Sequence, residues 1–227
     1  MPCAEVPRMP LPFTQSEFFD VMAAYNRAVW PAQFALEFSA VAVVWLAFRR
    51  VASAGVWVSA ILALLWTWTG VAYHWAFFAV INRAAWVFGS ICLAGAVAFA
   101  WFGVARRRIK VSFKLGKRGL FGWVLIAFAL VVYPALGVLV GHHYPASPTF
   151  GLPCPTTIFT VGVLLLTTPD TPRWVFVVPV IWSAIGASAA FLLGVYQDLG
   201  LVVSGLAAAW AMFSDVRSGP PELPASR

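Results

Sequence analysis

Seven apolar runs account for most of the chain, and short loops that hold most of the basic residues separate them. A transmembrane helix needs about 20 mainly apolar residues. The pattern therefore predicts an all-α, polytopic membrane protein with seven transmembrane helices. We place these helices at residues 30–48, 54–81, 84–105, 119–141, 155–168, 173–194 and 197–213.

The residues before the first run have an amphipathic pattern. The segment "TQSEFFDVMAAYNRAV" predicts a helix capped by Thr14, because Glu17 three residues later completes a capping box. The apolar face of this helix would hold Phe18, Met22, Tyr25 and Val29. We expect it to lie flat in the membrane interface. The predicted organisation is an N-terminal segment at 1–29, a transmembrane domain at 30–213 and a flexible tail at 214–227.

Composition and charge agree with a membrane protein. Hydrophobic residues make up 62% of the 227 residues and charged residues 10%, whereas about a quarter of a soluble domain is charged. The net charge of +7 does not indicate nucleic-acid binding, because the basic residues lie in loops between apolar runs. Twelve of the 15 Lys and Arg residues would share a side with the C-terminus. Positive loops stay inside, so we expect the N-terminus outside and the C-terminus inside.

The segment "GHHYPASPTFGLPCPTT" at residues 141–157 combines two histidines, a cysteine and four prolines without a charged side chain. The fifth apolar run, which follows, is too short for the hydrocarbon core, which is about 30 Å thick. We expect its helix to begin at Pro155 with Cys154 as the cap. The loop at 142–154 would then dip into the membrane from outside. Irregular backbone at that depth must be buried in protein or line a wet cavity.

Polar residues gather in the outer half of the predicted helices. Ionisable residues inside a membrane are costly and usually functional, so we interpret this group as one outward-facing polar cavity. We expect Glu37 and His74 to share it beneath the 142–154 loop. The candidate ligand-binding residues are Glu37, Tyr73, His74, Asn82, Thr156 and Asp198. The candidate metal ligands are His142, His143 and Cys154, donors that suit a transition metal.

Several known membrane chemistries do not fit the sequence. The last run lacks the lysine of a microbial rhodopsin and the His-x-x-x-His pair of ceramidase-type zinc hydrolases. The chain also lacks a phosphate-binding loop and the Gly-x-Ser-Gly elbow of rhomboid-like enzymes. Its three cysteines do not form a disulfide framework, although pairing of Cys3 with Cys154 stays open. An enzyme is therefore the less favoured class.

Four long motifs carry a family resemblance. They are "FFDVMAAYNRAVWPAQ", "GVAYHWAFFAVINRAAWVFG", "YPALGVLVGHHYPASPTFGLPCPTTIFTVGVLLL" and "WSAIGASAAFLLGVYQDLGL". Together they resemble domain of unknown function 6064, a family of bacterial multi-pass membrane proteins, over roughly residues 12–213. Arg83 stands where the resemblance implies a proline. The family has no established activity, so the resemblance supports the architecture and leaves the mechanism open.

Three functional hypotheses remain at this point. The first is a membrane protein whose outward-facing cavity binds or transports a small solute or a metal ion, with the lipid bilayer as its surroundings. The second is an intramembrane enzyme or a metal or haem protein that uses the same residues. The third is a membrane sensor or scaffold in which the cavity is packing.

Overall fold

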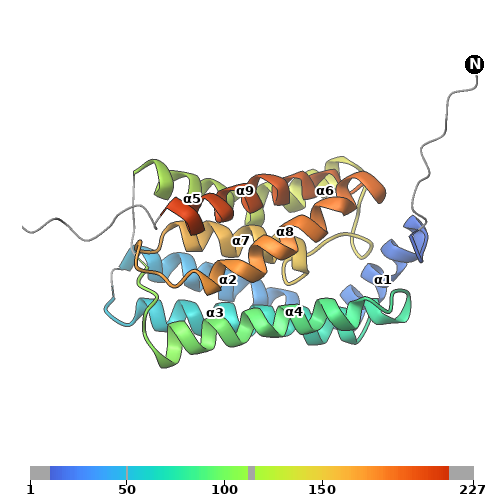
Figure 1. Ribbon diagram of the computed structural model, residues 1–227. Helices are drawn as coiled ribbons and strands as arrows, with labels where there is room; N and C mark the ends of the chain where they lie inside the picture. Colours follow the sequence, from blue (N-terminus) through green and yellow to red (C-terminus); the bar gives the residue numbers. More distant parts are fainter. Residues whose placement is uncertain (1–10, 50, 112–115, 215–227) are drawn as a thin grey trace, which may run out of the picture.

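Figure 1 shows a computed structural model of the chain, which describes residues 11–49, 51–111 and 116–214. Within these residues the chain forms nine α-helices, which confirms the predicted all-α fold. The helices are α1 (Gln15–Ala28), α2 (Ala32–Arg49), α3 (Ala54–Trp68), α4 (Ala85–Ala98), α5 (Lys117–Ala127), α6 (Tyr133–Leu139), α7 (Pro153–Leu165), α8 (Trp174–Leu192) and α9 (Leu199–Ser214). The predicted C-terminal tail lies outside the described residues, as do Cys3 and its suggested disulfide.

Three of the α-helices continue without a break into π-helical segments, which are η1 (Thr69–Trp75), η3 (Phe99–Ala105) and η4 (Phe128–Val132). Two short 3₁₀ segments, η2 (Phe78–Val80) and η5 (Tyr196–Asp198), precede α4 and α9. A π-helical turn rotates the residues after it relative to an α-helix, and such turns are frequent at functional sites. This matters below, because η1 contains Tyr73 and His74 and η4 ends just before Tyr133.

Five continuous helical stretches are long and apolar enough to cross a membrane. They are Ala32–Arg49, Ala54–Val80, Ala85–Ala105, Lys117–Leu139 and Trp174–Leu192. Large apolar side chains are exposed along their outer faces, as with Phe34, Phe38, Val41 and Trp45 on α2. Such a surface suits lipid rather than water. Helices α7 and α9 have only 13 and 16 residues, so the count of seven spans stays a prediction.

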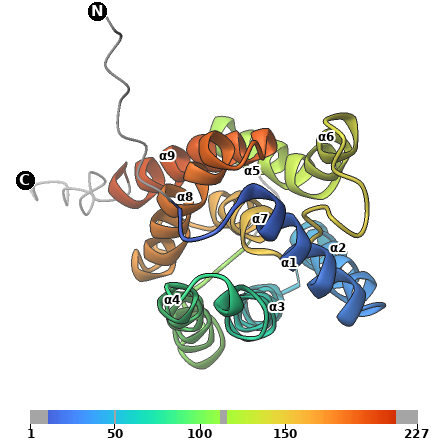
Figure 2. The same cartoon turned by 90° about the vertical axis from the view of Figure 1, so that its right-hand side faces the viewer.

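Helix α7 lies at the centre of the bundle, surrounded by the other long helices (Figure 2). Eleven residues of this 13-residue helix from Pro155 to Leu165 are buried, on every face, and the backbone before and after the helix, at Gly151 and Leu166, is buried as well. The expected short fifth helix is therefore confirmed, although it begins at Pro153 rather than at Pro155. Protein therefore surrounds α7 and the residues next to its two ends. Irregular backbone at membrane depth needs to be buried in protein in this way.

The ends of the helices form two distinct faces of the molecule. The loops after α2, η3 and α7 lie at one end, where the Thr168 N–H donates to the carbonyl of Lys110 at 3.1 Å. We call this the basic end, because Arg49, Arg106, Arg107, Arg108, Lys110, Lys117, Arg118 and Arg173 lie there. The opposite end, with α1 and residues 140–152, is the α1 end and carries Arg27 and Arg83 among the described basic residues. Exposed Trp30 and Trp86 mark the α1 end and exposed Trp45 and Trp174 the basic end, as the aromatic belts of a membrane protein do.

Helix α1 lies across the α1 end of the bundle (Figure 2). The capping box predicted for it is present, with both the Thr14 and the Glu17 side chains bonded to backbone N–H groups. Its placement in the membrane interface stays a prediction. Phe18, Met22 and Tyr25 are buried against the helical bundle, because the aromatic residues of η1 and η2 provide a protein surface for them.

Candidate functional site

A pocket with a volume of about 160 Å³ lies at the α1 end between α1, η1, α7 and α8. Exposed side chains of Ser188 and Leu192 border it on the outside, and buried His74, Tyr133 and Asp198 border it on the inside. Seven aromatic side chains line it, namely Phe13, Phe18, Tyr73, Phe78, Phe88, Tyr133 and Trp182. We call it the α1-end pocket. An apolar pocket with a few convergent polar groups is the usual form of a small-molecule site.

His74 is the least satisfied polar side chain of this pocket. It is 1% exposed, and neither of its ring nitrogens has a hydrogen-bond partner within the described part of the chain. Aromatic rings surround it, and the nearest ring centroid, that of Trp182, is 4.8 Å away. Buried polar atoms are nearly always hydrogen-bonded. An imidazole left in this state indicates that a further polar group or water belongs in the pocket.

Asp198 supplies the carboxylate of the pocket. It lies in η5, is 1% exposed and accepts a hydrogen bond from the Tyr133 hydroxyl at 2.5 Å. The Cys154 thiol, at the start of α7, interacts electrostatically with the same carboxylate. Among the described residues, no Lys, Arg or His side chain forms an ion pair with Asp198. A buried carboxylate must be paired with a positive charge or take up a proton. The described residues around Asp198 supply no such charge, so its carboxyl group either holds a proton or awaits a cation.

Gly186 keeps the space between Cys154 and Trp182 open. A Cβ atom at Gly186 would lie 2.7 Å from Leu201 Cδ1, 3.2 Å from the Trp182 indole nitrogen and 3.6 Å from the Cys154 sulfur. The buried indole N–H interacts with the Cys154 thiol. A glycine at this point of α8 therefore leaves a donor and a thiol facing the pocket.

More buried polar groups without partners lie close to this pocket. Gln197, which is adjacent to Asp198, has neither its amide oxygen nor its amide nitrogen hydrogen-bonded. The Thr156 hydroxyl, on the first turn of α7, also has no partner. Native proteins contain few such atoms, so these groups, like the His74 ring, are places where a ligand or water could add a hydrogen bond.

Helix α1 closes the pocket through specific hydrogen bonds. The Trp68 indole donates to the Tyr25 hydroxyl at 2.7 Å, and Gln15 donates to the carbonyl of Leu193 at 2.8 Å. Asn26 fixes the loop beside it by donating to the carbonyls of Pro145 and Ser147 at 2.6 and 2.8 Å. Burial raises the pKa of Tyr25 to about 12, so this hydroxyl stays protonated at neutral pH.

The structure separates Glu37 from this pocket, so the expectation that Glu37 and His74 share a cavity is wrong. Glu37 lines a different groove together with Gln33, Pro134 and Tyr144, on the side of the bundle between α2 and α6. The reason is the rotation of about 100° between successive residues of a helix. Leu36 takes the inward position and is 4% exposed, and Glu37 therefore points sideways.

The other candidate residues are divided between the pocket and the surface. Tyr73, His74, Asn82, Cys154 and Asp198 all line the α1-end pocket, and Thr156 is buried next to it. The Asn82 side-chain oxygen also accepts from the Ala84 N–H at 3.0 Å, in the turn just before α4.

The predicted metal ligands do not come together. The ring of His142 packs against Phe19 of α1 at 4.5 Å between centroids, and His143 is exposed, whereas Cys154 lies in the pocket. Among the residues that the structure describes, no three His, Cys, Asp or Glu side chains are placed so that they could hold a metal ion.

Sequence reasoning missed Tyr133, Trp182 and Asn26. Tyr133 and Trp182 lie within apolar runs, where an aromatic residue is expected to pack against lipid or core. A useful signal is the polar atom that each of them carries into a span, because a buried Tyr or Trp usually finds a hydrogen-bond partner. Asn26 could have been recognised as a polar residue next to the apolar face of α1, on the side of Tyr25.

Comparison with known proteins identifies the family of the chain but not its activity. Searches of curated proteins and of solved structures gave no significant match. A family model, described as "Family of unknown function (DUF6064)", matches residues 15–219. This range includes every residue of the α1-end pocket except Leu11 and Phe13. The chain therefore belongs to the family of unknown function DUF6064.

Proposed function

We propose that this protein spans the bacterial inner membrane seven times and binds a small organic cation with an apolar or aromatic body in the α1-end pocket. The observation that carries the proposal is the buried Asp198 carboxylate, which has no basic partner among the described residues and faces an aromatic pocket. The ligand would enter from the periplasmic side, between α1 and α8.

The carboxylate determines the charge of the proposed ligand. Removal of a charge from water is unfavourable unless an opposite charge and hydrogen bonds replace the water. Tyr133 gives Asp198 one hydrogen bond, and an ammonium group would give it a charge partner and further donors. Tyr73 and Trp182 present aromatic rings next to this position, and aromatic faces attract cations.

The size and lining of the pocket determine the body of the ligand. Its volume of about 160 Å³ is similar to the cavity of roughly 150 Å³ that holds benzene in an engineered protein. Phe13, Phe18 and Phe78 line the side of the pocket toward α1. A ring or short branched chain fits this space, and His74 would accept or donate one hydrogen bond to a polar substituent.

Calorimetric titration of the protein in lipid nanodiscs with benzylamine tests the proposal, with benzyl alcohol and benzoate as comparators. A probe this small is expected to bind with a dissociation constant of about 1 mM. Benzylamine should bind more tightly than either comparator. The Asp198→Asn variant should weaken benzylamine binding at least about tenfold, because it removes the charge partner.

Glu37→Gln is the matched control, since it removes a carboxylate from the same half of the molecule but from a different groove. It should leave benzylamine binding unchanged. If Glu37→Gln and Asp198→Asn weaken binding equally, or if benzoate binds best, the proposed site is wrong. Benzylamine flux into proteoliposomes then separates a transporter from a binding protein or sensor.

The membrane orientation has its own test. Eight of the ten Lys and Arg residues in the described part of the chain lie at the basic end, which supports a cytoplasmic basic end. A reporter fused to the C-terminus should therefore be active in the cytoplasm, and a tag at residue 2 should be accessible from the periplasm. The opposite result would reverse the side from which the ligand enters.

A further inference from the structure

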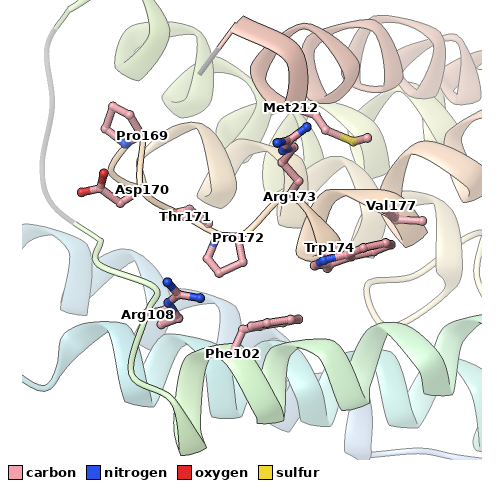
Figure 3. Close-up of a pocket in the computed structure, with 10 residues that line it drawn as sticks. All are labelled: Phe102, Arg108, Pro169, Asp170, Thr171, Pro172, Arg173, Trp174, Val177 and Met212. Atoms are coloured by element: carbon pink, nitrogen blue, oxygen red, sulfur yellow. The ribbon is translucent and has the colours of Figure 1, made fainter. Parts of the chain in front are cut away.

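A second cavity, with a volume of about 590 Å³, lies at the basic end, between the end of η3, the start of α8 and the last turn of α9. Figure 3 shows the side chains that line it. Because this cavity is at the opposite end of the bundle from the α1-end pocket, it needs a separate explanation.

The lining changes from charged to apolar along the cavity. Arg108, Asp170 and Arg173 lie where the loops meet the helix ends, whereas Trp174 and Val177 follow on the first turn of α8 toward the middle of the bundle (Figure 3). Met212 of α9 and Phe102 of η3 border the apolar part. A cavity of this kind matches an amphiphile whose head group lies at the membrane surface and whose chain points into the membrane.

The charged part is positive and has no anionic partner among the residues that the structure describes. Within the described residues, neither Arg108 nor Arg173 forms an ion pair, and the Asp170 carboxylate points away from both guanidinium groups (Figure 3). The neighbouring Arg106 differs, because its guanidinium packs over the Trp101 ring at 4.6 Å. Arg107 has a φ of 50° and borders another cavity, so the reversal of the chain at Arg107 brings Arg108 to the cavity of Figure 3.

A buried hydroxyl in the same cavity also lacks a partner. Thr171 lines the cavity and is 5% exposed, and its hydroxyl oxygen forms no hydrogen bond. A hydroxyl in this position is a donor for an anionic oxygen. Two guanidinium groups and one free hydroxyl donor are the groups that proteins use to hold a phosphate.

We propose that this cavity binds the phosphate-containing head group of an anionic phospholipid from the leaflet at the basic end, with an acyl chain along Trp174, Val177 and Met212. Basic pockets between transmembrane helices on the cytoplasmic side bind such head groups. The proposal shares with the proposed function only the placement in a membrane, and it does not depend on the α1-end pocket.

Native mass spectrometry of delipidated protein, offered equal amounts of phosphatidylglycerol and phosphatidylcholine, tests the proposal. The wild-type protein should retain phosphatidylglycerol preferentially. The double variant Arg108→Gln, Arg173→Gln should lower this preference about tenfold, because it removes the two guanidinium groups that line the cavity and would donate to the phosphate. Met212→Trp, which narrows the apolar part without a change in charge, should weaken retention of phosphatidylglycerol more than of inorganic phosphate.

The double variant Arg49→Gln, Arg107→Gln is the control, because it removes two charges from the same end but outside this cavity. It should change the preference less than about twofold, since charges that do not contact the bound head group act at a distance and are screened by salt. Equal losses in both double variants, or equal retention of the two lipids by the wild-type protein, would overturn the proposal. Benzylamine binding should stay unchanged in all these variants, so that a failure here is separate from a failure of the α1-end pocket.

Discussion

The Tyr133 hydroxyl donates a hydrogen bond to the Asp198 carboxylate and so connects the start of α6 to the short turn before α9. Both residues are buried, and 65 positions separate them in the sequence. The bond holds the carboxylate at the inner side of the α1-end pocket. The contribution of this bond to the stability of the protein can be measured separately from ligand binding.

Tyr133→Phe should destabilise the protein by about 1–3 kcal/mol, because it leaves a buried acceptor without its donor while the ring is kept. Thermal or detergent-induced unfolding measures the change. Tyr144→Phe is the control, since the Tyr144 hydroxyl donates to the Asn26 carbonyl at 3.2 Å from a half-exposed side chain. Equal stability of the Tyr133→Phe variant and the wild-type protein would show that the bond does not hold Asp198.

Asn26→Ala should lower the free energy of unfolding by about 2–4 kcal/mol. The buried Asn26 side chain both donates hydrogen bonds to the 145–149 loop and accepts one from it, and the variant loses them all. Hydrogen exchange of residues 142–152 should increase in this variant. Asn82→Ala removes a single exposed hydrogen bond to the Ala84 N–H and should lower the free energy of unfolding by about 1 kcal/mol. The expectation is contradicted if the loop exchanges no faster in Asn26→Ala than in Asn82→Ala.

Gly162→Ala should strongly destabilise the contact between α5 and α7. A Cβ atom at Gly162 would lie 2.8 Å from the Gly122 carbonyl oxygen, and the two backbones would have to move apart. The free energy of unfolding should fall by about 1–3 kcal/mol, which is the usual effect of adding a methyl group to a well-packed core. Gly116→Ala has open space around it, and a comparable loss in that variant would contradict the explanation.

Docking of α1 should weaken in acid. Burial first, and the neighbouring His143 second, lower the pKa of His142 from its ordinary value of 6.5. The imidazole therefore binds a proton less readily when α1 is docked. The stability of the docked state is fully present above about pH 6.5 and is lost as the pH falls through the lowered pKa of the folded state.

Hydrogen exchange of α1 at pH 7.5 and pH 5 tests this prediction. His142→Gln should remove most of the pH dependence, because no proton then binds at the position that packs against Phe19. His143→Gln should retain most of it, since burial is the larger cause. An α1 that opens equally at both pH values in the wild-type protein would rule out His142 as the origin.

The helical architecture could be predicted because it depends on local patterns. The Thr14 and Glu17 capping box needs only two residues three positions apart, and the brevity of α7 follows from the prolines around it. The pocket depends on rotation and packing. On α2, Leu36 rather than Glu37 faces the interior of the bundle, although the two positions are adjacent in the sequence. The π-helical turns of η1 and η4 also change the helix faces on which Tyr73, His74 and Tyr133 lie.

The N-terminal helix illustrates the same difference. Its apolar face was predicted correctly, since Phe18, Met22 and Tyr25 follow a helical period. The partner of that face could not be deduced, because an amphipathic helix buries the same residues against lipid or against protein. The partner is a cluster of rings from η1 and η2, and it becomes visible only when the chain is folded.

The rate of Cys154 modification with and without benzylamine tests the central claim most directly, because the thiol lies in the α1-end pocket beside Asp198. In a Cys3→Ser variant, a membrane-impermeant maleimide should label Cys154 slowly and leave the fully buried Cys92 unlabelled. Benzylamine at about 20 times its dissociation constant should slow labelling of Cys154 at least about tenfold, since the occupied pocket excludes the reagent. The Asp198→Asn variant should lose this protection and Glu37→Gln should keep it. Labelling that benzylamine does not slow, or that proceeds at Cys92 while Cys154 stays unmodified, would contradict a ligand site at this pocket.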